Sequence, residues 1–242
     1  MSTAGIIIIG EEILSGKVDE CNSGFIAKRL RAKGVKVKRI SVIPDDIDDI
    51  AYETKLFSDK FDFVFTSGGL GPTHDDVTID GIARGFGVRV VVDDYLREIL
   101  DRRYGDRVTP ERLKMAQVPE GANIIVNKEI EFPLIQFKNL FIFPGIPKYL
   151  KDKLLSIEEL FNEPPILLKR VYVNEIESEI APFLNEVVRN HGNVEIGSYP
   201  IMDNSDYRVI LTFESISKDS LDSAVREMTE SAFKNRIIRV DG

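Results

Sequence analysis

The sequence of 242 residues is short of the residues that build covalent and nitrogen- or sulfur-liganded sites. It has one cysteine, Cys21, two histidines, His74 and His191, and no tryptophan. A single cysteine excludes an intramolecular disulfide and a cysteine-rich zinc site. Because histidine is so scarce, any metal site must draw mainly on oxygen ligands. Cys21 has no histidine near it in sequence and is interpreted as a packing or surface residue.

Long apolar runs and an excess of basic residues are also missing. No run approaches the roughly 18 apolar residues of a membrane span. The short run at 6–9 has no basic segment before it, as a signal peptide would have. With 32 basic against 40 acidic residues the net charge is −8, which argues against a nucleic-acid-coating protein. We therefore expect a cytoplasmic protein with neither membrane nor nucleic-acid partners.

What the sequence does contain is a regular alternation of strand-like and helix-like segments. The apolar fraction of 43% is enough for a sizeable core. Apolar or alternating runs at 4–9, 35–43 and 61–66 are each followed by a helical pattern, and short strands are predicted at 88–92, 124–126, 134–137 and 140–143. This order predicts an α/β fold, a three-layer, mostly parallel sheet with helices on both faces.

A domain boundary is predicted at Asn162-Glu163-Pro164-Pro165, because paired prolines cannot continue a helix. After it the pattern restarts, with strands at 167–173, 194–198 and 207–213 and helices at 175–190 and 220–233. We expect a first domain over residues 1–162 and a small β-α-β-β-α domain over 166–242. The small domain has no glycine-rich phosphate loop, and we expect it to serve packing or oligomerisation.

The most informative stretch follows the third strand and reads S-G-G-L-G-P-T from Ser67 to Thr73. Glycines let backbone amides approach a ligand with no Cβ in the way, and a turn that leads into a helix favours a phosphate. The alternative is an ordinary strand-to-helix connection. The glycine-rich stretch matches no common nucleotide-binding motif. His74 stands where a dinucleotide motif would have its third glycine. The predicted phosphate-binding residues are Ser67, Gly68, Gly69, Gly71 and Thr73, with Gly145 of the Pro144–Pro147 turn as a second place of close approach.

Acidic residues follow the same strand ends. Aspartate at a helix start is commonly an N-cap, so each pair (Asp45-Asp46 and Asp75-Asp76) has a purely structural alternative. In open α/β sheets, however, ligands bind beyond the carboxyl ends of the strands. Three predicted strands end in this way, and the acidic residues that follow them are expected to converge on one crevice. These residues are Glu12, Asp45 and the pair Asp75-Asp76. Carboxylates beside phosphate oxygens predict a magnesium-type site.

Taken in order along the chain, these motifs resemble a known family. They are similar to the molybdopterin-binding fold, and within it to the N-terminal part of CinA-like proteins, over essentially the whole chain. The specific part is Ser67–Thr73 followed by Asp75-Asp76. The supporting matches are Gly10-Glu11-Glu12-Ile13-Leu14, Asn22, Asp45, Asp75-Asp76-Val77-Thr78, Pro119-Glu120-Gly121-Ala122 and Pro144-Gly145-Ile146-Pro147.

The resemblance implies a metal-dependent pyrophosphatase that acts on a dinucleotide such as ADP-ribose or FAD. It leaves two alternatives open: a molybdopterin-binding protein of molybdenum cofactor biosynthesis, and a non-catalytic nucleotide-binding module. By position, Asp45 and Asp76 would be catalytic, and Asp75, Asp76 and Glu12 would hold a divalent ion (Mg²⁺, Mn²⁺ or Co²⁺). A nucleotide or pterin phosphate would be the ligand, and self-association is expected.

Three features of this chain depart from the family pattern. The family usually has Thr at the position of Glu11, so the first loop is altered. The C-terminal amidohydrolase domain of many CinA proteins is absent from these residues, so no nicotinamide-nucleotide deamidation is expected. The segment Lys128–Leu134 lacks the glycines that the family usually carries there. We expect that side of the pocket to be narrower, the substrate preference to differ, or the activity to be lost.

Overall fold

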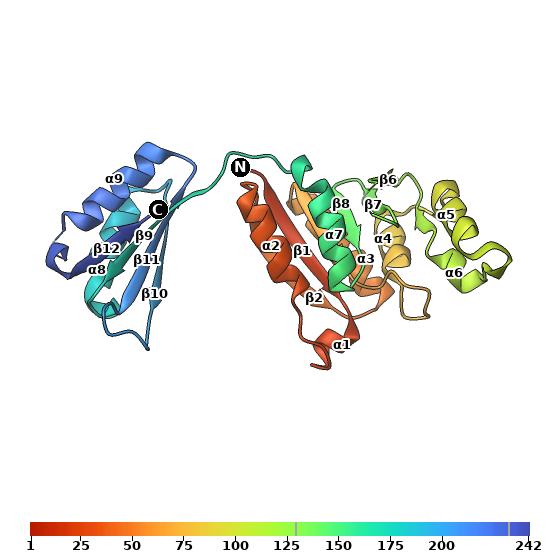
Figure 1. Cartoon of the computed structure of the whole chain (residues 1–242), viewed down its shortest axis with the longest axis horizontal. Coiled ribbons are helices and arrows are strands. Elements are labelled where there is room, and N and C mark those ends of the chain that lie inside the picture. Colours follow the sequence, from red (N-terminus) through yellow and green to blue (C-terminus); the bar gives the residue numbers. More distant parts are fainter. Residues whose placement is uncertain (129, 232) are drawn as a thin grey trace. The chain divides into compact units, whose positions relative to one another are not determined.

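The computed structural model describes residues 1–128, 130–231 and 233–242. The chain divides into two compact units, Met1–Glu163 and Pro164–Gly242, each with its own sheet and helices (Figure 1). The division falls within the Asn162–Pro165 segment, where the paired prolines stand.

A six-stranded sheet in the order β2-β1-β3-β8-β7-β6 forms the centre of the first unit. β1, β2, β3 and β8 are parallel, whereas β7 runs antiparallel to β8 and β6 antiparallel to β7. The predicted mostly parallel sheet is thereby confirmed. The strands are β1 (Thr3–Ile9), β2 (Lys36–Ile43), β3 (Phe63–Ser67), β6 (Asn123–Ile125), β7 (Leu134–Phe137) and β8 (Leu140–Phe143).

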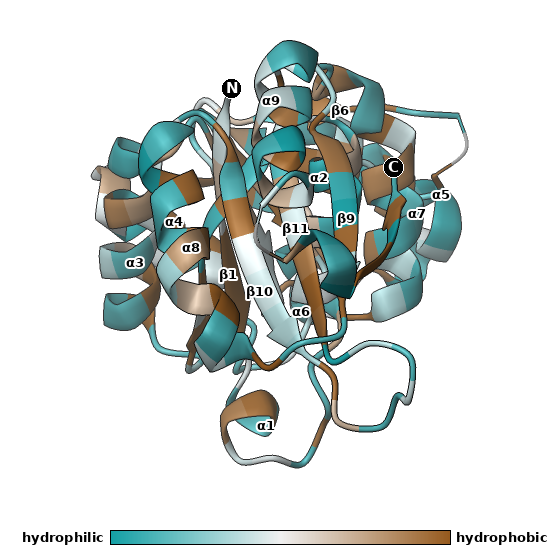
Figure 2. Ribbon diagram, turned by 90° about the vertical axis from the view of Figure 1, so that its left-hand side faces the viewer, coloured by the Kyte–Doolittle hydropathy of each residue, from teal (hydrophilic) through white to brown (hydrophobic). Residues whose placement is uncertain are grey.

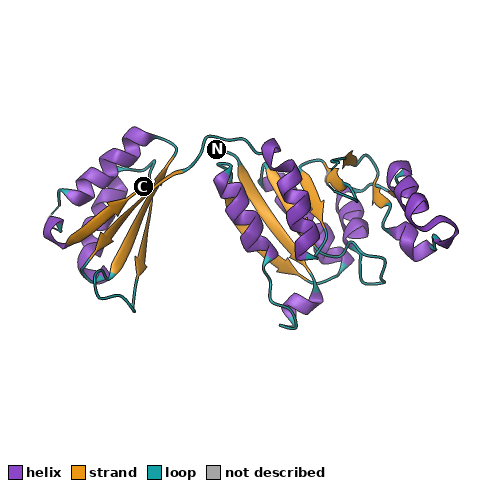
Figure 3. Ribbon diagram, viewed as in Figure 1, coloured by secondary structure: helices purple, strands orange, loops and turns teal. Residues whose placement is uncertain are grey.

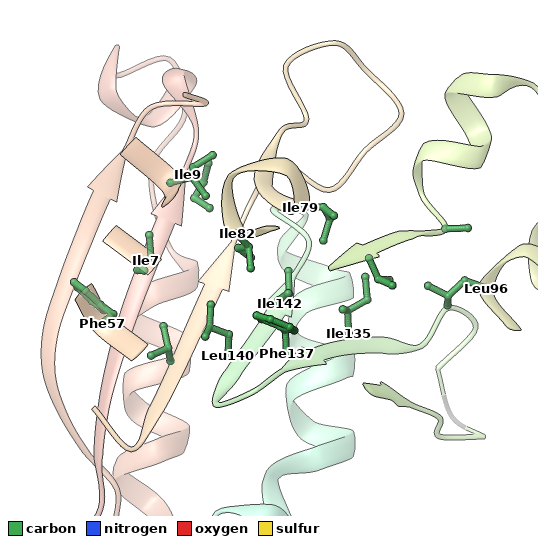
Figure 4. Close-up of a cluster of buried hydrophobic side chains, with 14 of the residues drawn as sticks. Ile7, Ile9, Phe57, Ile79, Ile82, Leu96, Ile135, Phe137, Leu140 and Ile142 are labelled. Carbon is green, nitrogen blue, oxygen red and sulfur yellow. The ribbon is translucent and has the colours of Figure 1, made fainter. Parts of the chain in front are cut away.

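Helices cover both faces of this sheet (Figure 3). On one face α2 (Asn22–Ala32) and α7 (Pro147–Ile157) pack on Ile6 and Ile8 of β1. On the other, α3 (Ile47–Lys60) and α4 (Thr78–Phe86) pack on Ile7 and Ile9, the cluster drawn in Figure 4. Burial on both faces explains why β1 is a continuous apolar run. In Figure 2, α3 and α5 carry mostly hydrophilic residues on their outer surfaces.

Residues 88–119 form an excursion outside the main sheet. β4 (Val90–Val92) pairs antiparallel with β5 (Gln117–Pro119), and between them lie α5 (Asp94–Tyr104), a 3-10 turn (Gly105–Arg107) and α6 (Pro110–Lys114). The predicted strand near 88–92 therefore exists, but in a separate two-stranded ladder. Leu96, Leu100 and Ala116 anchor the excursion in the same core as α3 and α4.

The second unit is a four-stranded antiparallel sheet in the order β10-β11-β9-β12 with a helical layer formed by α8 and α9. Its elements are β9 (Leu167–Val173), α8 (Glu177–Asn190), β10 (Glu195–Pro200), β11 (Val209–Ser215), α9 (Lys218–Thr229) and β12 (Ile237–Asp241). The sequence interpretation ended at the second helix and missed β12. No turn signature precedes this largely exposed edge strand, so its pattern is weak.

None of the helices in the described part of the chain is long and apolar enough to cross a membrane. The remaining short elements of the first unit are α1 (Glu11–Leu14), directly after β1, and a 3-10 turn (Glu158–Leu160) after α7. In the second unit a 3-10 turn (Lys234–Arg236) leads into β12.

Candidate functional site

The carboxyl ends of β1, β2, β3 and β8 lie together at one edge of the main sheet. Ile9 is opposite Ile43, and Ser67 is opposite both Ile8 and Phe143. In Figure 1 this edge is the lower end of β1 and β2, beside α1. The loops that leave these four strands carry the residues singled out from the sequence, so the structure brings them to one edge.

Gly68 ties the glycine turn to the neighbouring strand. Its φ is +119°, and a Cβ built on it would lie 1.9 Å from the carbonyl oxygen of Ile9. Its own N–H donates to the carbonyl of Phe143, at 3.1 Å, and its carbonyl accepts from Oγ1 of buried Thr78, at 2.9 Å. No residue with a side chain fits this position without a backbone shift.

Gly69 continues the turn with a φ of +62°, and it too leaves no room for a side chain. A Cβ here would lie 2.3 Å from Oγ1 of Thr78 and 3.4 Å from Oδ1 of Asp45. The Gly69 carbonyl accepts from the N–H of Thr78, at 3.2 Å. Thr78 thus holds both glycines through one side chain and one amide, and Asp45 lies against the turn.

The amides of the turn are available to a ligand. Among the residues that the structure describes, no acceptor is found for the N–H groups of Gly69, Leu70 and Gly71. All three residues are partly exposed. Consecutive unpaired N–H groups form a concavity suited to an anion. The phosphate role predicted for Gly69 and Gly71 stays a prediction, for which the turn rather than a helix terminus offers the N–H donors.

Asp76 closes the far side of the turn. Its Oδ2 accepts from the Thr73 N–H, at 2.8 Å, and from the Thr73 hydroxyl. A Cβ on Gly71 would lie 2.4 Å from the same oxygen. Asp76 therefore fixes the conformation of residues 71–76, in addition to the catalytic and metal roles predicted for it. Asp75 and His74 are exposed beside it.

Asp45 and Asp46, adjacent in sequence, differ in structure. Asp46 is the N-cap of α3 and accepts from the N–H groups of Asp48 and Asp49, at 2.8 and 3.1 Å. Asp45 instead accepts from the N–H of Glu11, at 2.9 Å, across the edge of the sheet. Burial raises the pKa of Asp45, as do the negative charges of Glu12, Asp75 and Asp76, although the Glu11 N–H opposes the shift. Asp46 therefore has the structural role of a helix cap, whereas Asp45 remains the candidate site residue.

The carboxylates are close enough to influence one another, but they do not form a complete metal site. Within the described ranges, no three Asp, Glu, His or Cys side chains are arranged to hold a metal ion by themselves. Mg²⁺ at phosphate sites takes one or two carboxylates and completes its shell with phosphate oxygens and water. The metal role predicted for Glu12, Asp75 and Asp76 stays a prediction, in which substrate oxygens and water would supply the remaining ligands.

A second turn supports the first from the other face of the sheet. A Cβ on Gly145 would lie 3.4 Å from the Cα of Gly68, so the two turns touch. Asn22, buried at the start of α2, donates to the Gly145 carbonyl at 2.7 Å and to the Ser67 hydroxyl at 3.1 Å. Ser67 is buried under the turn, where its hydroxyl serves this network. Its predicted phosphate contact would need a rearrangement of that network.

The segment Lys128–Leu134 approaches the same edge, because Ile135 pairs with Ile142 and β7 begins beside the end of β8. Glu129 lies outside the described residues. Lys153 of α7, itself buried, donates to the carbonyls of Phe132 and Pro133, the latter at 2.6 Å. Burial lowers the pKa of Lys153 to about 8. A lysine thus holds the segment that lacks glycine.

Two residues that contact the turn were not assigned roles from the sequence. Thr78 appeared only in the motif, and Lys114 of α6 not at all. Nζ of Lys114 donates to the carbonyl of Thr73 at 2.7 Å, across 41 positions of sequence. No local pattern identifies such a contact, because the excursion that carries Lys114 is placed by its own core residues.

Comparison with known proteins agrees with this arrangement. A family model described as "Probable molybdopterin binding domain" matches residues 5–162. The chain belongs to this family. The molybdopterin-binding domain is followed by a match to "FAD synthase, middle domain" over residues 165–241. The resemblance to CinA-like proteins is confirmed as well: the crystal structure of CinA from Thermoplasma acidophilum has a TM-score of 0.62 at 33% identity, covering 66% of this chain and 98% of that one.

The relatives of this chain differ in length. A protein from Archaeoglobus fulgidus is 38% identical over 225 residues, which cover 93% of this chain and 96% of that protein. A probable FAD synthase from Caenorhabditis elegans is 32% identical over 259 residues, covering 94% of this chain and 49% of that protein. The chain therefore spans about half the length of that FAD synthase.

Proposed function

We propose that the protein hydrolyses the pyrophosphate group of a dinucleotide, of the ADP-ribose or FAD type, in a reaction that depends on a divalent metal ion. The observation that carries the proposal is the juxtaposition of two features. Unpaired amides of Gly69–Gly71 form an anion-binding turn, and Asp45 lies against that turn among other carboxylates. A divalent cation beside the turn would offset the repulsion between the Asp45 carboxylate and a bound phosphate.

The overall reaction consumes one water and breaks one P–O bond of the pyrophosphate. ADP-ribose would give AMP and ribose 5-phosphate, and FAD would give AMP and FMN. When bound, the metal ion would polarise the phosphoryl oxygens and lower the cost of their developing charge. Asp75, Asp76 and Glu12 would hold it, which leaves Asp45 to act on the water.

The protein's own groups would bind, orient and accept a proton. The turn amides would hold phosphate oxygens at fixed positions and stabilise charge that develops on them. Glu11 N–H orients Asp45 through Oδ2 and leaves Oδ1 toward Gly69, where the carboxylate can accept a proton from the attacking water. Asp76 keeps the turn closed through Thr73.

The matched relatives support a nucleotide substrate. The second-unit match to the middle domain of FAD synthase and the similarity to a probable FAD synthase both point to a dinucleotide-related role. The test is release of AMP from ADP-ribose and from FAD, with Mg²⁺, Mn²⁺ or Co²⁺ restored to chelator-treated protein. Turnover that appears only with metal supports the proposal. No turnover with either substrate and any of the three ions would refute it.

A second candidate, favoured by the family match over residues 5–162, is a molybdopterin-binding protein of cofactor assembly. The same turn amides would hold a pterin phosphate. Fluorescent pterin retained through purification, together with complementation of a cofactor-deficient strain, would favour this function. If the protein binds nucleotides by calorimetry but turns none over, it is instead a binding module.

A further inference from the structure

Lys114 is a cation presented to the glycine turn from a distant part of the chain. It is the last residue of α6, and its Nζ donates to the Thr73 carbonyl at 2.7 Å. The carbonyl belongs to the residue whose N–H and hydroxyl are held by Asp76. The ammonium therefore lies at the outer end of the turn that offers its amides to an anion.

The charge of the site explains why such a cation matters. Asp45, Glu12, Asp75 and Asp76 place four negative charges near the turn, and their mutual repulsion is felt at Asp45. A pyrophosphate adds further negative charge when it binds. One metal ion offsets only part of this, so a protein cation that reaches the phosphates would strengthen binding.

The backbone around Lys114 is anchored, so a move to a phosphate would involve only the side chain, which now donates to the Thr73 carbonyl beside Asp75. The excursion is closed at its base by a hydrogen bond from Asp93 N–H to the Ala116 carbonyl, at 2.9 Å. Ala116, two residues after Lys114, is fully buried. Lysine has a flexible four-carbon stem, so Nζ can leave a carbonyl for a nearby phosphate oxygen with no backbone movement.

We propose that Lys114 is a substrate-contacting residue whose ammonium moves from the Thr73 carbonyl to a phosphate oxygen of the bound nucleotide. The inference rests on the proposed function, because it names a further group of the same site. The competing interpretation is that Lys114 only staples the turn through its hydrogen bond to Thr73.

Three variants separate the two interpretations. Lys114→Gln keeps an N–H donor for the Thr73 carbonyl but has no charge, Lys114→Met has neither, and Lys114→Arg keeps both. Lys60→Met is the control, because Lys60 ends α3 at the opposite edge of the sheet and is exposed. All four are compared with the wild-type chain for kcat and KM on ADP-ribose with Mg²⁺, and for ADP-ribose affinity by calorimetry.

A phosphate contact predicts that Gln and Met lower kcat/KM alike, by about 10- to 100-fold. The loss should appear in affinity as well, it should shrink at high salt, and Arg should retain most of the wild-type value. If Gln behaves like the wild type while Met does not, Lys114 is only a staple. If Met also behaves like the wild type, Lys114 has neither role. In both cases the inference fails while the proposed function stands. If the wild type neither binds nor cleaves ADP-ribose, both fail together.

Discussion

Replacing Gly68 with alanine tests whether the turn is seated on β1 as the structure shows. The new Cβ would lie 1.9 Å from the Ile9 carbonyl oxygen, at a φ of +119°. Such a backbone conformation costs an L-residue about 1–3 kcal/mol. Relief of the contact requires β1 and β3 to move apart, because the Cβ is bonded directly to the Cα of residue 68 and cannot rotate away from the backbone oxygen of Ile9. We expect a total loss of at least about 3 kcal/mol in the free energy of unfolding.

Gly87→Ala is the matched control. Gly87 ends α4 in the left-handed conformation, with a φ of +65°, and a Cβ there meets nothing within 4 Å. Its substitution should cost only about 1 kcal/mol. In calorimetric unfolding of the full chain, about 2–4 °C per kcal/mol is expected for a unit of this size. Gly68→Ala should thus lower the melting temperature of the first unit by roughly 6–12 °C, and Gly87→Ala by about 2–4 °C. Equal losses for the two variants would refute the close approach to Ile9.

Three further predictions follow from single contacts. Lys153 has a lowered folded pKa of about 8, so the native state binds fewer protons than the unfolded chain between pH 8 and 10.5. The stability of the wild type relative to Lys153→Met should therefore rise by about 3 kcal/mol across that window in urea unfolding; a constant difference would contradict the burial effect. Asp45 has a raised pKa, and stability associated with it falls as pH rises above 3.8. Asp45→Asn, which still accepts from Glu11, should be as stable as the wild type or up to about 1 kcal/mol more stable at pH 7, and a clear loss of stability would contradict this. Thr78→Val should destabilise by about 1–3 kcal/mol, since the Gly68 carbonyl loses its buried donor, whereas Thr78→Ser should retain most of the stability if the hydroxyl is the cause.

Local patterns carry most of the fold of the first unit. The apolar run that forms β1 needs no tertiary information, because burial on both faces leaves no polar position. Gly68 and Gly69 likewise indicate positive φ values from the sequence alone, because glycine adopts them without a steric penalty. β12, by contrast, is an exposed edge strand whose pairing with β9 depends on the completed sheet. β4 has strand-like composition, yet only its pairing with β5 places it outside the main sheet.

The site is predictable from sequence where its residues follow strand ends, and not elsewhere. Parallel strands bring Glu12, Asp45 and Asp76 to one edge, as the topology requires. That Asp45 is oriented by Glu11 while Asp46 caps α3 depends on the path of the chain after β2. Lys114 reaches the turn from an excursion of the chain whose placement no local pattern specifies.

The difference between the two neighbouring aspartates offers the most direct test of the proposed pyrophosphatase. Asp45→Asn and Asp46→Asn change one charge each at adjacent positions, and asparagine serves as well as aspartate at an N-cap. AMP release from ADP-ribose with Mg²⁺ is measured for both variants and the wild type. We predict a loss of at least about 100-fold in kcat for Asp45→Asn and a change of less than about threefold for Asp46→Asn. Equal activity of the two variants would contradict the assignment of Asp45 to the reaction.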